Sequence, residues 1–149
     1  MKRIVVFLLA LIVTYVIAAI ASTQSVLARL SEMGIVVTLD HRIGAMLHDL
    51  VGMATTFLPL LAAGLLIAFL LTALVNRWVV DLRTPLYVLA GASAVIAVHV
   101  CLKLALDITP VAAARSAGGL VIQAFAGAIG GYVFAITSGN GALADKTGE

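Results

Sequence analysis

Three ionisable side chains share one stripe of an otherwise apolar segment. His99, Lys103 and Asp107 are spaced four residues apart, within and just beyond the segment 86–106. In an α-helix this spacing places them on one face. Histidine titrates near neutral pH, and an ionisable residue inside a membrane helix is a functional candidate by default. The stripe is therefore the first candidate for chemistry.

Other polar residues are expected at the same end of the molecule. His48 and Asp49 come just before the apolar segment 51–75, and Arg115 comes just before the segment 117–137. If successive helices alternate in direction, these residues lie near the level of Asp107. The candidate polar site therefore has six members: His99, Lys103, Asp107, Arg115, His48 and Asp49. One interpretation is structural, with ion pairs at the membrane rim and a hydrogen-bonded His99. The other is an ion, proton or small-solute path that uses His99.

A metal or haem site formed by histidines is a weaker hypothesis. His41 and His48 lie seven residues apart, about 10 Å along a helix, which is too far for both to bind one ion. His48 and His99 differ in depth by about 13 Å in straight antiparallel helices, whereas two haem ligands must be level. The sequence therefore predicts no cofactor.

Enzymatic motifs are not recognisable in this sequence. There is no phosphate-binding loop, no carboxylate dyad and no nucleophile–base pair at a recognisable spacing. The single cysteine, Cys101, lies about 200° around the helix from His99 and is expected to be a packing residue. We therefore expect a non-enzymatic protein.

Composition places the chain in a membrane. Of its 149 residues 63% are hydrophobic and 11% are charged, and the mean hydropathy is +1.20. A soluble domain is about one quarter charged. The net charge of +2 gives no support for nucleic-acid binding.

The apolar segments predict an all-α fold in a single membrane domain, residues 1–149. Four transmembrane helices are expected at about 4–21, 51–75, 86–106 and 117–137, arranged as two antiparallel hairpins and followed by a short polar tail, 138–149. Thr-Pro pairs at 84–85 and 109–110 predict the starts of the last two helices. Ser138 and the residues that follow it are expected to end the fourth.

The first hairpin is expected to carry amphipathic extensions on both sides of Gly34, which is a natural helix stop. Thr38 is the expected N-cap of the second arm. Its pattern starts at Leu39 and continues into the second span without a break, and Pro59 is expected to kink that span. These arms either stand up as a helical pair or lie flat on the membrane.

The fourth helix has small residues at a four-residue spacing. Gly119, Gly127 and Gly131 share one face with Gln123. Small residues let helix backbones approach closely in lipid, and Gln123 can add a hydrogen bond across the contact. This face is expected to pack within the chain, or alternatively against a second copy.

Basic residues predict the orientation. One side of the membrane carries five of them, Lys2, Arg3, Arg77, Arg83 and Lys146, and the other carries Arg29, Arg42, Lys103 and Arg115. The excess predicts that both termini are cytoplasmic, and the composition suggests a bacterial inner membrane.

The expected function is that of a small membrane subunit or scaffold. Its partners would be the lipid bilayer and either another membrane protein or a second copy. The alternative is a small transporter or channel with His99 in its path. The surroundings of His99 distinguish the two, because a polar cavity favours transport and burial against small residues favours a scaffold.

Overall fold

The computed structural model describes residues 2–106 and 117–144. Its helices, in chain order, are α1 (Lys2–Glu32), α2 (Leu39–Gly52), α3 (Phe57–Val75), the short 3-10 helix η1 (Val80–Leu82), α4 (Arg83–Leu106) and α5 (Ala117–Ala144). Helices α1, α3, α4 and α5 are long and apolar enough to cross a membrane. The prediction of an all-α bundle with four membrane helices is confirmed.

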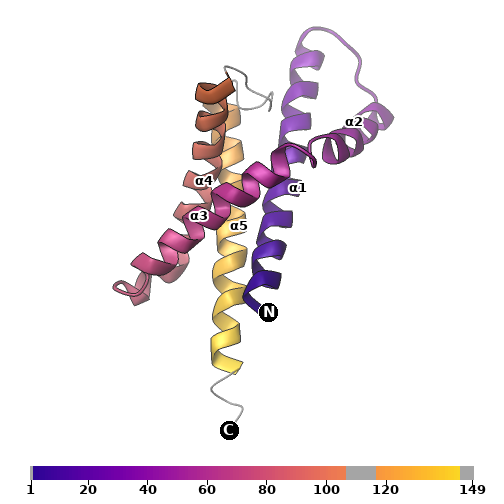
Figure 1. The fold of residues 1–149 in the computed structure, drawn as a ribbon. Helices are drawn as coiled ribbons and strands as arrows, with labels where there is room; N and C mark the ends of the chain where they lie inside the picture. Colours follow the sequence, from indigo (N-terminus) through magenta and orange to yellow (C-terminus); the bar gives the residue numbers. More distant parts are fainter. Residues whose placement is uncertain (1, 107–116, 145–149) are drawn as a thin grey trace.

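Helix α5 lies between α1 and α4 and packs against both (Figure 1). Helix α3 crosses this layer obliquely, packing mainly on α4 and touching α1 over a shorter stretch. The core is therefore built where α3 covers the junction of the other three helices. It includes Leu61 and Leu65 of α3, Val95 of α4 and Ala126 of α5, all fully buried.

The second span differs from the expected continuous helix. Helix α2 ends at Gly52, residues 53–56 form turns, and α3 begins at Phe57. Proline in a helix interior removes a hydrogen bond and its ring clashes with the preceding turn. In the structure Pro59 lies in the first turn of α3, where no intrahelical donor is needed. Instead of a kink at Pro59, the structure has a break between α2 and α3, at residues 53–56.

Gly34 ends α1 as expected. It adopts a positive φ of 81°. Its N–H donates to the carbonyl of Ser31 at 3.0 Å, and the N–H of Ile35 donates to the carbonyl of Leu30 at 3.1 Å. This pair of bonds is the Schellman arrangement, which satisfies carbonyls left free at a helix end. Thr38 occupies the N-cap position of α2, but its hydroxyl bonds to His41 Nδ1 at 2.6 Å instead of capping a backbone N–H.

The ends of the last two helices shift from their expected positions. Helix α4 already begins at Arg83, and α5 continues past Ser138 to Ala144. Arg83 donates a hydrogen bond to the Ser138 hydroxyl at 2.6 Å, which ties the start of α4 to the end of α5. The expected helix start at Thr109-Pro110 lies outside the described residues.

Replacing Gly34 with alanine is expected to destabilise the protein by about 1–2 kcal/mol, because an L-residue is strained in the left-handed conformation. Gly44→Ala is the matched control, since both glycines have open space where a Cβ would lie. Gly44 is in a helix interior, so alanine there should be neutral or stabilise by up to about 1 kcal/mol. Reversible unfolding in mixed micelles measures both variants. Equal effects would contradict the account of this turn.

Candidate functional site

The backbones of α4 and α5 are in direct contact at three glycines. A Cβ added to Gly91 would lie 2.0 Å from the carbonyl oxygen of Gly127, and one added to Gly127 would lie 2.2 Å from that of Gly91. A Cβ on Gly131 would lie 2.0 Å from the carbonyl oxygen of Tyr87. Larger residues cannot be accommodated here without separating the helices. Gly127 and Gly131 of α5 therefore lie directly against α4 of the same chain.

A neighbouring part of α5 faces α1. Gln123 is fully buried, and its Nε2 donates to the carbonyl of Ala18 at 2.9 Å. Two turns nearer the C-terminal end of α5, a Cβ on Gly130 would meet the hydroxyl of Thr14, which itself donates to the carbonyl of Ala10. The Gln123 side chain thus fixes the depth of α1 relative to α5. Its Oε1 has no hydrogen-bond partner among the described residues.

His99 is buried in the bundle, with 5% of its surface exposed. Its Nδ1 lies 2.8 Å from the carbonyl of Val95, one turn back along its own helix. The ring of Phe57 packs edge-on against the imidazole, with the ring centroids 5.5 Å apart. Its Nε2 is buried and has no partner within the described ranges. His99 is therefore covered by an aromatic ring at its α3 side.

The structure does not gather the predicted polar site around His99. Lys103 is exposed although it follows His99 by one turn. His48 is exposed on α2, and Asp49 accepts a hydrogen bond from the Thr23 hydroxyl at 2.8 Å. Asp107 and Arg115 lie outside the described residues. The four described residues of the predicted site therefore do not form one cluster: His99 is buried, Lys103 and His48 are exposed on different helices, and Asp49 contacts α1.

A second polar contact lies at the break between α2 and α3. The Tyr15 hydroxyl donates to the carbonyl of Leu50 at 2.5 Å. Together with the bond between Thr23 and Asp49, it fastens the end of α2 to α1. Sequence reasoning missed both α1 residues. The signal was present, because Tyr15 and Thr23 are hydrogen-bonding residues in or beside an apolar run, and lipid gives such groups no partner.

The described residues do not bring potential metal ligands together. They contain no group of three or more His, Cys, Asp or Glu residues able to hold a metal ion. His41 and His48 are exposed on α2, whereas His99 is enclosed behind Phe57. These histidines therefore face different surroundings.

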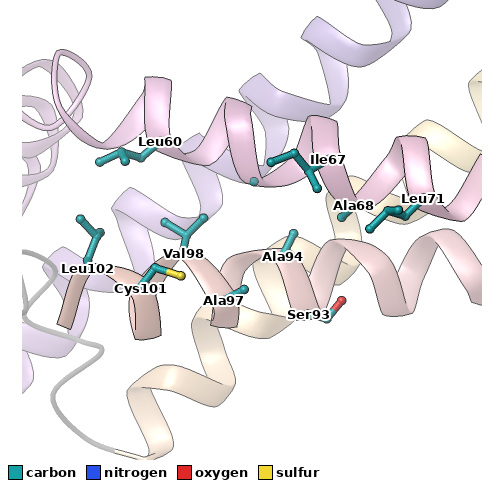
Figure 2. A pocket seen from close by; sticks show the side chains of 11 residues that line it. Leu60, Ile67, Ala68, Leu71, Ser93, Ala94, Ala97, Val98, Cys101 and Leu102 are labelled. Carbon is teal, nitrogen blue, oxygen red and sulfur yellow. The ribbon is translucent and has the colours of Figure 1, made fainter. Parts of the chain in front are cut away.

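An open groove runs between α3 and α4 (Figure 2). Its volume is about 580 Å³. The α4 side carries small residues at a four-residue spacing, Ser93, Ala97 and Cys101, all exposed. The full lining comprises Leu60, Gly64, Ile67, Ala68, Leu71, Ser93, Ala94, Ala97, Val98, Cys101 and Leu102.

Almost all of this lining is apolar. The Ser93 hydroxyl is turned to its own helix, where it donates to the carbonyl of Ala90 at 3.1 Å. Cys101, which the sequence suggested was a packing residue, is exposed at the groove. His99 does not line it. The groove is thus an apolar surface at membrane depth, separate from the histidine.

Comparisons with protein-family models, with curated proteins and with solved structures give no match to this chain.

Gly127→Ala is expected to lower the free energy of unfolding by about 1–3 kcal/mol, the usual effect of overpacking. The added methyl group would meet the backbone of α4, which cannot rotate away. Gly118→Ala is the control on the same helix, since a Cβ there meets no described residue within 4 Å. Unfolding in mixed micelles measures both. A Gly127→Ala protein as stable as Gly118→Ala would refute the close contact.

Tyr15→Phe is expected to destabilise the protein by about 1 kcal/mol, because it leaves the Leu50 carbonyl without its hydroxyl donor. Tyr132→Phe is the matched control, because Tyr132 is an exposed tyrosine of α5. Its effect should stay within about 0.5 kcal/mol. Amide hydrogen exchange of residues 50–57 provides a local readout, and it should accelerate in Tyr15→Phe alone. Unchanged exchange there would show that Tyr15 does not hold the break.

Proposed function

We propose that the protein is a non-enzymatic subunit of a membrane complex, and that the groove between α3 and α4 receives a transmembrane helix of another protein. The observation that carries this proposal is the exposed row of Ser93, Ala97 and Cys101 along the groove. Small residues at this spacing let a second backbone approach closely, which is the main source of helix association in lipid.

A different protein suits the groove better than a second copy. Gly127 and Gly131 of α5 are already packed against α4, which removes them from any contact between copies. A twofold dimer would place the same patch on both sides of its interface. Two concave grooves set against each other would leave a void between them. A convex helix from another chain fills the space instead.

The surroundings of His99 support a subunit over a transporter. Phe57 covers the imidazole, and the groove lining is apolar and excludes His99. A path for ions or protons requires polar groups or water along its length. The separation of the buried His99 from the exposed His41 and His48 gives no support to a shared metal or haem.

We also propose a bacterial inner-membrane location with both termini cytoplasmic. Helix α1 begins and α5 ends at the same end of the bundle, where α3 also connects to α4 (Figure 1). This end carries Lys2, Arg3, Arg77 and Arg83. Basic residues in short connections favour the cytoplasmic side.

Cross-linking from Cys101 tests the proposed subunit role. The cysteine is the only one in the sequence and lies exposed at the groove, so a benzophenone maleimide attached to it reports what fills the groove. In native membranes we expect an adduct with a peptide from a membrane-spanning segment of another protein. Ala97→Phe fills the groove and should abolish this adduct at equal labelling yield.

Leu89→Phe is the control for this experiment, because Leu89 is exposed on α4 but does not line the groove. It should leave the adduct unchanged. An adduct of twice 15.4 kDa would identify a second copy. That result, an adduct with lipid alone, or an adduct insensitive to Ala97→Phe would each overturn the proposal.

A further inference from the structure

Helix α2 presents an apolar stripe that no described part of the bundle covers. None of its described side chains is buried. Leu39, Ile43, Leu47 and Val51 follow one another at four-residue spacing and are 72%, 50%, 60% and 74% exposed. A row of large apolar residues along a single helix face requires an apolar partner.

The other sides of α2 either carry an exposed polar residue or contact α1. Arg42 donates to Gln24 at 3.1 Å and Asp49 accepts from Thr23, so these two residues face α1. His48 is exposed and lies about 140° around the helix from Ile43. The helix therefore has one side against α1, an apolar side and an exposed histidine side.

The end of α2 lies at membrane depth. The carbonyl of Leu50 is held by Tyr15, which lies inside the apolar segment 4–21 of α1. Helix α3 has 19 residues, about 28 Å, and it crosses the bundle obliquely (Figure 1). A tilted helix of this length needs almost all of its residues to cross a hydrocarbon core of about 30 Å. The break before Phe57 and the end of α2 therefore lie near the edge of the hydrocarbon.

We propose that α2 lies along the boundary between headgroups and acyl chains, with its apolar stripe in the hydrocarbon of one leaflet and His48 toward the headgroups. Lipid is the occupant because α2 is followed, after residues 53–56, by the membrane helix α3, on which Leu60, Leu66 and Ile67 are also exposed. An upright pair with α1 is inconsistent with the divergence of the two helices (Figure 1). Interfacial helices of this kind sink about 5–10 Å below the headgroups.

Spin labels at single cysteines test this placement in a Cys101→Ser background. The full-length protein is reconstituted in vesicles of phosphatidylethanolamine and phosphatidylglycerol, with labels at Ile43, Leu47 and His48 in turn. Oxygen collides with labels in hydrocarbon, and a water-soluble nickel chelate collides with labels in water. Leu89 of α4 supplies the lipid-facing reference, and Arg77, exposed beyond the end of α3, supplies the aqueous reference.

Labels at Ile43 and Leu47 are expected to match Leu89 in favouring oxygen, whereas the label at His48 should match Arg77 in favouring nickel. Leu47 and His48 are adjacent, so a difference between them reports the helix face and not the region of the chain. All three sites are exposed, so the labels replace no core contact. Nickel access at Leu47 equal to that at His48 would overturn the proposal. So would a Leu47 label shielded from both reagents, which would indicate a protein partner.

Discussion

Two helix backbones touch where Gly91 of α4 meets Gly127 of α5, and the positions of the other helices follow from that contact. Lipid offers no hydrophobic force that draws helices together, so association relies on close packing and hydrogen bonds. The pair α4–α5 forms the most extensive helix contact among the described residues. Helix α1 is then set against α5 by Gln123, and α3 lies over the junction.

The hydroxyl groups of α1 inside the bundle follow the same constraint. In a region without water each buried polar group needs a partner from the protein. Thr14 and Thr23 donate to the carbonyls of their own helix one turn back, and Thr23 also donates to Asp49. The broken chain between α2 and α3 is possible at this depth because Tyr15 satisfies the carbonyl of Leu50 and local turns satisfy others. Tyr15 and Thr23 of α1 therefore hold the end of α2 next to the break between α2 and α3.

Part of this arrangement was predictable from the sequence. Hydropathy located the membrane helices, and Gly34 marked the end of α1, because both depend on local chemistry. The break was not predicted, because Pro59 permits either a kink or an interruption, and the choice depends on partners supplied by α1. Once the helix breaks, α2 turns away, so His48 is exposed and cannot join His99.

The two described members of the predicted polar stripe, His99 and Lys103, differ in their surroundings. Each four-residue step rotates by about 40° around a helix, so His99 lies against Phe57 while Lys103 has already moved to the exposed surface. The groove was not predicted either. Ser93, Ala97 and Cys101 are ordinary small residues in the sequence, and their shared exposure depends on how α3 crosses α4.

Gly127 and Gly131 pack against α4 within the chain, and we propose that the groove between α3 and α4 receives a partner. Native mass spectrometry of the protein, released from its own membrane in polymer nanodiscs, measures this most directly. We expect a particle in which the 15.4 kDa chain is accompanied by at least one different polypeptide. A particle containing only the 15.4 kDa chain, alone or in several copies, would contradict it.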